Sequence, residues 1–354
     1  MNPSINRRNL LKAGTAAAVV PLAACSGGDR LPLPADAPIG PFGAESTAEE
    51  VTADLNLAGK TALVTGCNSG IGYETMRVLA LRGATVIGAA RTEEKAIQAC
   101  ESVPGLTVPA VVELSDFDSI VAACEKIKAG HQKIDMLICN AGVMELPELE
   151  QVYGIERQFV INHLGHFLLT NLLLDLVKAA PEGRVAVVSS GQSTRGAPDQ
   201  GIMFGQLSGE GWYTPNYGYG HSKLANTLFS LELNKRLAGT NARSNSLTPG
   251  VIPTNLGRHM PRWKTLTLET VGKVFTKTVP QGAATSCYVA TAPGLSGAGG
   301  WFFKDCNPHR PGGHTEDSEM AAELWAVSAE IVAPWLNRAP ALAANFAFGG
   351  MMLR

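Results

Sequence analysis

Thr65-Gly66-Cys67-Asn68-Ser69-Gly70-Ile71-Gly72 is the stretch of the chain that decides the fold. It follows an apolar run of strand length, residues 61–65, and precedes a stretch with a helical pattern, residues 73–82. Glycines here permit a tight turn and a close approach of the backbone to a pyrophosphate, and the helix adds unpaired N–H groups and its positive dipole end. Glycine spacing alone is also typical of an ordinary turn, so the prediction of a phosphate-binding turn depends on the flanking strand and helix.

Apolar runs of strand length alternate with amphipathic stretches of helix length along the chain. The runs are residues 61–65, 85–89, 108–112, 136–139 and 185–188. This alternation predicts an α/β fold, a doubly wound and mostly parallel sheet, in one domain over residues 56–333. Residues 26–55 are rich in Pro, Gly and Ala and are interpreted as a tether, and residues 334–354 as a C-terminal tail.

The first 25 residues have the pattern of an export signal. Arg7 and Arg8 precede the small apolar run 13–24, which is shorter than the ~20 residues of a membrane-spanning helix. The run ends in Leu-Ala-Ala before Cys25, a pattern similar to a lipoprotein box with Cys25 as the acylated residue. We therefore expect export by the twin-arginine route and a periplasmic or cell-envelope lipoprotein. Plain signal cleavage near the same alanines is the alternative.

The charge balance excludes a strong electrostatic partner. The chain has 29 basic and 31 acidic side chains, a net charge of −2, so we expect no nucleic-acid partner and membrane contact only through the lipid anchor. Cys306, His309 and His314 loosely resemble metal ligands, but they lie among prolines and glycines without a fourth ligand, so we predict no metal. The six cysteines besides Cys25 contain no Cys-x-x-Cys pair and are interpreted as small buried hydrophobes.

Arg91 stands at the position where a doubly wound fold selects its nucleotide. It follows the second apolar run at about the expected ~20 residues from the glycine turn, and an arginine there suits the extra phosphate of NADP. NADP(H) is therefore favoured. Glu93 and Glu94 keep NAD(H) open, and a solvated surface arginine is the alternative interpretation.

Tyr219 and Lys223 form a candidate proton-transfer pair. They are four residues apart in a stretch with helical apolar spacing, residues 219–238, so they share one helix face. A phenol with a reference pKa of about 10 is a poor acid and base near neutrality, and a neighbouring ammonium favours its anion. A tyrosine and a lysine at this spacing are more often solvent-exposed residues without a catalytic role. The glycine turn in the same chain favours the catalytic interpretation.

Together, the glycine turn, Asn140-Ala141-Gly142, Ser190 and Tyr219 to Lys223 resemble the signature set of the short-chain dehydrogenase/reductase family over nearly the whole chain after residue 55. The segments 161–167, 221–226 and 303–306 are most similar to the branch of the retinol dehydrogenases and the WW-domain-containing oxidoreductase. His163 and His166 within this branch motif are interpreted as packing or capping residues.

The resemblance implies a role for each site residue. Ser190, in preference to Ser189, would hydrogen-bond the substrate oxygen, Tyr219 would be the general acid or base, Lys223 would bind the nicotinamide ribose and Asn162 would hold a water of the proton relay. Glu113-Leu114 replaces the usual Asp-Leu, which puts the adenine hydrogen bond in doubt. The implied cofactor contacts are Gly66, Asn68, Ser69, Gly70, Ile71, Gly72, Arg91, Glu113, Leu114, Asn140, Ala141, Gly142, Tyr219, Lys223, Pro249, Gly250, Val251 and Thr254.

The predicted function is an NADP(H)-dependent oxidoreductase that interconverts an alcohol and a carbonyl on a lipophilic small molecule. Two apolar stretches around the family's small substrate lobe favour a lipophilic substrate, unless they only pack that lobe: Met203, Phe204, Leu207, Trp212 and Tyr213, then Trp263, Leu266, Leu268 and Phe275. An exported protein that holds the cofactor as a binder, sensor or scaffold without turnover is the alternative. A homo-oligomer is compatible with the sequence.

Overall fold

The computed structural model describes residues 31–252 and 276–338. The expected signal sequence and Cys25 lie outside the described residues, and so do Thr254 and the second apolar stretch, 263–275.

A mostly parallel sheet forms the centre of the described chain. Its strands lie in the order β10-β9-β8-β7-β4-β1-β2-β3, and all neighbours are parallel except β9 and β10. This order confirms the predicted doubly wound α/β fold, because the chain reverses direction across the sheet after β3. The bounds are β1 Thr61–Thr65, β2 Thr85–Ala90, β3 Thr107–Val111, β4 Met136–Cys139, β7 Arg184–Val188, β8 Arg243–Thr248, β9 Phe302–Lys304 and β10 Asn307–His309.

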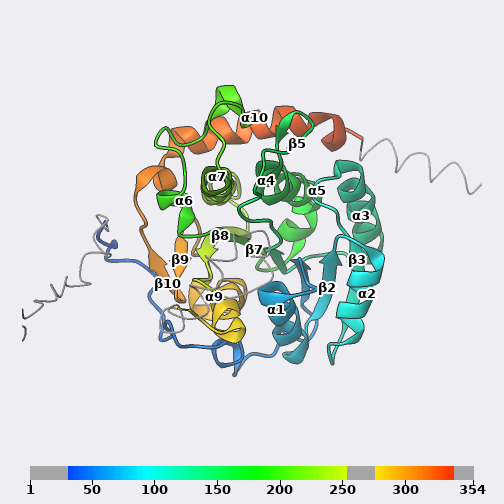
Figure 1. The fold of residues 1–354 in the computed structure, drawn as a ribbon. Helices are drawn as coiled ribbons and strands as arrows, with labels where there is room; N and C mark the ends of the chain where they lie inside the picture. The colour runs from blue at the N-terminus through cyan, green and yellow to red at the C-terminus, as the bar shows by residue number, and fades with distance from the viewer. Residues whose placement is uncertain (1–30, 253–275, 339–354) are drawn as a thin grey trace, which may run out of the picture. The chain divides into compact units, whose positions relative to one another are not determined.

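Helices cover both faces of this sheet (Figure 1). One apolar core lies under α1 (Gly70–Leu81), α2 (Glu93–Glu101) and α9 (Val279–Thr291). The other lies under α3 (Phe117–Gly130), α5 (Gly165–Ala179) and α7 (Pro215–Arg236), and α10 (Ser318–Leu336) packs across α7 and α5. Successive residues of β1 alternate between the cores, Ala62 and Val64 into the first and Leu63 into the second, as a strand covered on both faces requires.

Short elements complete the second face. The hairpin β5 (Gln151–Val152) and β6 (Ile155–Glu156) leads into α4 (Arg157–Phe159), a π-helix over Val160–Leu164 and then α5. A further short helix, α6 (Gln192–Arg195), precedes α7. The continuous helical run Arg157–Ala179 is long and apolar enough to cross a membrane, but 78% of its most apolar window is buried inside the protein, so it is a core helix.

Part of the segment interpreted as a tether packs on the domain. Residues 31–55 contain a short 3-10 helix, Glu50–Thr52, and Ala48 and Val51 are buried in the core beneath α9. The amide of Asn307 in β10 donates to the Phe42 carbonyl at 2.6 Å. At the other end, α10 continues to Leu336, three residues past the predicted domain boundary at residue 333. Trp335, in the segment interpreted as a tail, packs on Phe117 of α3 with ring centroids 5.0 Å apart.

Candidate active site

A pocket of about 750 Å³ opens at the carboxyl ends of the parallel strands. Residues that directly follow β1, β2, β3, β4, β7 and β8 line it, which is where ligands bind in doubly wound folds. The pocket brings together most of the predicted cofactor contacts: Gly66, Asn68, Ser69, Gly70, Ile71, Gly72, Arg91, Glu113, Leu114, Asn140, Ala141, Gly142, Tyr219, Lys223 and Pro249. Gly250 and Val251 lie next to Pro249 in the chain but do not line it.

The glycine turn forms a cradle whose conformation and close packing leave no room for side chains. Gly66 and Gly70 have φ angles of 70° and 56°, a conformation that L residues rarely adopt. A Cβ on Gly72 would lie 2.3 Å from the Gly66 carbonyl oxygen and 2.4 Å from Nδ2 of Asn140. That amide in turn donates to the Thr65 carbonyl at 2.8 Å. The turn therefore packs tightly on Asn140 on one side. Its other side and the start of α1 face the pocket, as the binding of a diphosphate requires.

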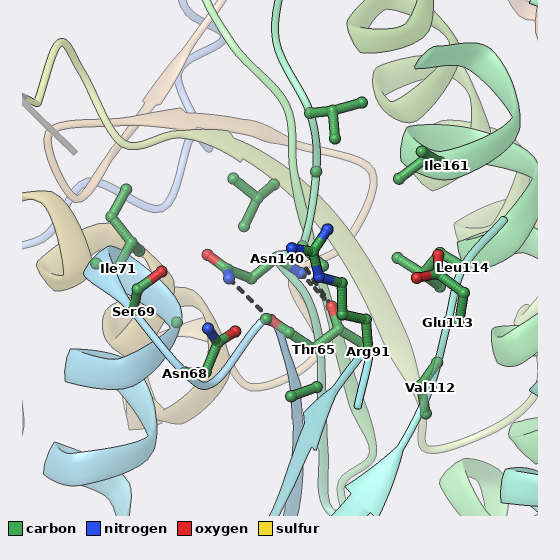
Figure 2. Close-up of a pocket in the computed structure, with 18 of the residues that line it drawn as sticks. Thr65, Asn68, Ser69, Ile71, Arg91, Val112, Glu113, Leu114, Asn140 and Ile161 are labelled. Atoms are coloured by element: carbon green, nitrogen blue, oxygen red, sulfur yellow. Dashed lines mark hydrogen bonds between the residues drawn. The ribbon is translucent and has the colours of Figure 1, made fainter. Parts of the chain in front are cut away.

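Charged side chains gather at the second-strand end of the pocket. Arg91 lies between the glycine turn and the segment that carries Glu113 and Leu114 (Figure 2). Lys95, on the first turn of α2, also lines the pocket. We did not predict Lys95, although its position four residues after Arg91 could have indicated it. The Glu113 carboxylate accepts from the Ser115 amide at 3.0 Å and from the Ser115 hydroxyl at 2.7 Å. The glutamate, which is one methylene longer than the usual aspartate, is therefore bonded to the loop that directly follows it.

Tyr219 and Lys223 lie buried on one side of α7 where they meet the pocket. Their exposed fractions are 5% and 3%, and Lys223 Nζ is 5.7 Å from the centre of the Tyr219 ring. Burial raises the pKa of Tyr219 to about 12, an effect that a hydrogen bond with Ser190 opposes and the charge of Glu145 increases. Burial lowers the pKa of Lys223 to about 8. Lys223 Nζ donates to the Val188 carbonyl at 3.0 Å, which holds the ammonium between β7 and the pocket.

The two neighbouring serines have different environments. Ser189 donates its hydroxyl to the Lys223 carbonyl at 2.7 Å and also contacts Thr227 Oγ1 at 2.8 Å, so it ties β7 to α7. Ser190 lies close enough to the Tyr219 phenol to oppose the rise of its pKa, and its hydroxyl accepts from the Gln192 N–H at 3.2 Å. The serine that we selected is therefore near the tyrosine, but Ser189 and not Ser190 lines the pocket.

Asn162 lies in the π-helix with its side chain engaged inside the protein. Its amide group donates to the Val143 carbonyl and to Ser222 Oγ, both at 2.9 Å, and its Oδ1 accepts from the Val143 N–H at 2.9 Å. Val143 follows Asn140-Ala141-Gly142, and Ser222 precedes Lys223. The side chain therefore ties the loop after β4 to the part of α7 that carries Tyr219 and Lys223, and its expected contact with a water stays a prediction.

The chain matches the family model for short chain dehydrogenase over residues 60–202. It is 40% identical over 303 residues to Short-chain dehydrogenase TIC 32 B, chloroplastic, of Brassica napus, an alignment that covers 82% of this chain and 94% of that protein. The chain belongs to the short-chain dehydrogenase/reductase family. It is an oxidoreductase that interconverts alcohols and carbonyl compounds with a nicotinamide cofactor, NAD(H) or NADP(H).

Two further comparisons place this short-chain dehydrogenase/reductase within the family. It is 39% identical over 294 residues to Retinol dehydrogenase 14 of Homo sapiens, covering 77% of this chain and 86% of the relative, which confirms the likeness to the retinol dehydrogenase branch. Among solved structures it resembles a protein from Mycobacterium Paratuberculosis with a TM-score of 0.62 and 34% identity, covering 79% of this chain and 96% of the other.

The apolar side chains expected to shape the substrate site mostly pack elsewhere in the dehydrogenase. None of Met203, Phe204, Leu207, Trp212 and Tyr213 lines the pocket; Phe204 and Leu207 pack against the second core, and the Trp212 ring contacts His221 at 4.9 Å. Val143, Leu146 and Pro147 line the pocket instead, together with the ion pair of Glu150 and Arg157. The loop after β4 carries the first four, and Arg157 is the first residue of α4. No repeating pattern in the sequence indicates them.

The residues considered as metal ligands are dispersed in the dehydrogenase. Among the residues that the structure describes, no group of three or more His, Cys, Asp or Glu side chains is arranged to hold a metal ion. The buried Cys306 contacts Thr285, while His314 contacts the Asp199 carbonyl at 2.9 Å.

Proposed function

We propose that this chain is an NADP(H)-dependent oxidoreductase that interconverts an alcohol and a carbonyl on a lipophilic small molecule, with Tyr219 as the general acid and base. The observation that supports it best is the arrangement of one pocket: Tyr219 and Lys223 form one part of its wall, and the glycine turn and Arg91 form others. Ser190 does not line this pocket but lies close enough to the Tyr219 phenol to affect its pKa. The glycine turn, which lines the pocket and packs on Asn140 so closely that Gly72 has no room for a Cβ, fits a dinucleotide diphosphate. Arg91 and Lys95 favour the form with the additional phosphate.

The chain's own residues move the proton. When bound, the nicotinamide supplies or accepts the hydride. In reduction, Tyr219 donates its phenolic proton to the oxygen of the forming alcohol, and in oxidation its phenolate accepts that proton. Ser190, beside the phenol, donates a hydrogen bond to the same substrate oxygen. Burial raises the pKa of Tyr219 to about 12 in the protein without cofactor. The phenolate would be stabilised by the ammonium of Lys223, whose Nζ lies 5.7 Å from the ring centre, and by an oxidised nicotinamide.

Two lines of support favour a lipophilic substrate. The part of the pocket formed by Val143, Leu146 and Pro147 is apolar. The relatives named retinol dehydrogenases act, by those names, on a lipophilic alcohol. A substrate that buries its apolar body against these residues gains roughly 25 cal/mol for each Å² removed from water.

The replacement Tyr219→Phe tests this function. The ring still packs, so we expect NADPH binding near that of the wild type and loss of nearly all turnover, followed through nicotinamide absorbance with long-chain and short polar aldehydes and ketones. Tyr217→Phe, a 41% exposed tyrosine on the same helix, is the matched control and should remain active. Substantial activity in Tyr219→Phe would exclude the mechanism. A wild-type protein that binds NADPH and reduces no carbonyl would instead support a cofactor-holding binder or sensor.

We propose that the mature enzyme acts outside the cytoplasm. The support is the sequence of residues 1–25, with Arg7 and Arg8 before an apolar run and Cys25 at its end. Replacement of both arginines by lysine should retain the protein in the cytoplasm, and Cys25→Ala should prevent labelling with a radioactive fatty acid. An unchanged location of the double variant would refute export by this route.

A further inference from the structure

His166 makes a hydrogen bond at each ring nitrogen and is fully buried. It is the second residue of α5, and its exposed fraction is 0%. Nε2 lies 2.9 Å from Oγ1 of Thr65, the last residue of β1, and Nδ1 lies 3.0 Å from the main-chain oxygen of Asn162 in the π-helix. The ring therefore joins the strand that leads into the glycine cradle to the helix that carries Asn162.

The partners of Thr65 determine which nitrogen of His166 carries the hydrogen. Thr65 Oγ1 accepts from the backbone N–H groups of Asn140 and Ala141, both at 2.9 Å, and these bonds use its two lone pairs. Its own hydrogen must then be donated, and His166 Nε2 at 2.9 Å is closer than the Ile138 carbonyl at 3.4 Å. Nε2 is thus an acceptor, and Nδ1–H donates to Asn162.

Burial keeps this ring neutral. Desolvation lowers the pKa of His166 to about 4, against the hydrogen bond to Asn162, and the nearby charge of Lys223 lowers it further. A neutral imidazole has one donor and one acceptor, and both are used here in fixed directions.

The two ends of this connection reach the two halves of the active site. On one side, Thr65 holds the Asn140 and Ala141 backbone and its own carbonyl accepts from Asn140 Nδ2, the group packed beneath Gly72. On the other side, Asn162 donates to Ser222, the residue before Lys223.

We propose that His166 is a positioning residue that holds the dinucleotide cradle and the Asn162–Lys223 region in a fixed relation. This inference rests on the proposed function. His166 contacts neither the pocket nor the reacting groups; it acts through Thr65 on the cradle and through Asn162 on the proton-transfer groups. Its loss leaves the Thr65 hydroxyl hydrogen with only the more distant Ile138 carbonyl as an acceptor and removes the side-chain donor to the Asn162 carbonyl. Small shifts of positioned groups lower rates by about 100-fold.

Two conservative variants separate the two connections. In His166→Gln the side-chain oxygen can reach the place of Nε2 and accept from Thr65, so NADPH affinity should stay within about threefold of the wild type while kcat falls. In His166→Asn the shorter amide can donate to Asn162 but cannot reach Thr65, so NADPH affinity should fall about tenfold while kcat recovers relative to Phe. His166→Phe removes both bonds, and we expect about 10- to 100-fold losses in each quantity.

His163→Phe is the matched control. His163 is also 0% exposed and lies one turn earlier, but it contacts Ser328 of α10 at 2.8 Å rather than the cradle. The His163→Phe variant should lower the midpoint of thermal unfolding without a loss of NADPH affinity or kcat comparable to that of His166→Phe. Equal effects of the two Phe variants, or Gln and Asn variants that behave alike, would overturn the proposal.

Nuclear magnetic resonance of ¹⁵N-histidine-labelled protein provides a test that needs no substrate. The imidazole ¹⁵N signals that are present in the wild type and absent in His166→Gln belong to His166. They should be those of the tautomer with the hydrogen on Nδ1, and signals of the tautomer with the hydrogen on Nε2 would overturn the proposal. If the wild type binds NADPH but has no turnover, the catalytic part of the proposed function fails, while the NADPH affinities and the tautomer still decide the role of His166. If it does not bind NADPH, the proposed function fails and the role of His166 fails with it.

Discussion

Replacing Lys223 with Met should make the protein more stable while removing its activity. Lys223 is almost entirely buried, and burial lowers the pKa of its ammonium group to about 8. Methionine retains an apolar stem of similar length without the charge. The Val188 carbonyl keeps a partner after the replacement, because Asn226 Nδ2 also donates to it at 3.1 Å. The variant therefore leaves no main-chain group of β7 unpaired.

The expected gain follows from the two pKa values of the lysine. The unfolded chain has a lysine pKa of about 10.4, and each unit of difference corresponds to about 1.4 kcal/mol. Keeping the charged lysine buried at pH 7 thus costs roughly 3 kcal/mol. We expect the free energy of unfolding of Lys223→Met to exceed that of the wild type by about 2–3 kcal/mol, since the hydrogen bond to Val188 is lost.

The pH dependence identifies the source of this gain. Between pH 8 and pH 10.4 the unfolded wild type binds more protons at this lysine than the folded wild type, so wild-type stability rises with pH in this window. The variant has no such group. The difference in unfolding free energy should therefore narrow from about 2–3 kcal/mol at pH 7 to below about 1 kcal/mol at pH 10.

Urea unfolding of cofactor-free protein, followed by circular dichroism at both pH values, measures these differences. Lys235→Met is the control, because Lys235 lies on the same helix with 49% of its side chain exposed and should change stability by less than about 0.5 kcal/mol. A Lys223→Met variant that is no more stable than the wild type at pH 7, or a difference that persists at pH 10, would refute the argument.

Arg91→Ala should weaken NADPH binding about 10- to 100-fold and NADH binding little, because only NADPH has the phosphate that Arg91 would pair with; equal losses in fluorescence titrations would exclude this role. Gly72→Ala should lower NADPH affinity at least about tenfold, since its Cβ would lie 2.3 Å from the Gly66 oxygen, and an unchanged dissociation constant would contradict the cradle. Ser190→Ala should lower kcat about 100-fold with little change in unfolding midpoint. Ser189→Ala should instead cost about 1–2 kcal/mol of stability through the Lys223 and Thr227 contacts, and the reverse pattern would mean that the serines were assigned wrongly. Finally, free NADP(H) is a cytoplasmic compound, so exported protein should retain NADP through extensive gel filtration; empty protein that binds NADP weakly and reversibly would rule out a resident cofactor.

Local sequence patterns predicted the main elements of the fold. The apolar runs coincide with β1, β2, β3, β4 and β7 to within one residue at each end. β1, β2, β4 and β7 are buried parallel strands, which must be apolar on both faces, whereas β3 lies at the edge of the sheet and leaves Val108 and Val111 exposed. The apolar runs did not predict β8, which reads Arg-Ser-Asn-Ser-Leu-Thr. Its buried polar groups are satisfied by distant partners: Ser244 pairs with Ser230 at 2.8 Å, and Asn245 donates to the Ala298 carbonyl at 3.0 Å.

The packing of the 31–55 segment likewise depended on contacts that no local pattern contains. Asn307, more than 260 residues away, both accepts from the Gly40 N–H at 3.1 Å and donates to the Phe42 carbonyl. Composition rich in Pro and Gly indicates only that a segment lacks regular structure, not that it lacks a surface to pack on.

The sequence by itself determined the fold class, the glycine turn, the Tyr219–Lys223 spacing and the cation after the second strand, because each depends on residues close together in the chain. Only the tertiary structure decided how the site is supported. It bonded the Ser189 hydroxyl to the Lys223 carbonyl by bringing α7 against one face of β7, and it engaged the Asn162 side chain with Val143 and Ser222. It also fixed the tautomer of His166, since a histidine in a sequence has two equivalent choices. Thr65, 101 residues earlier in the chain, removes one of them.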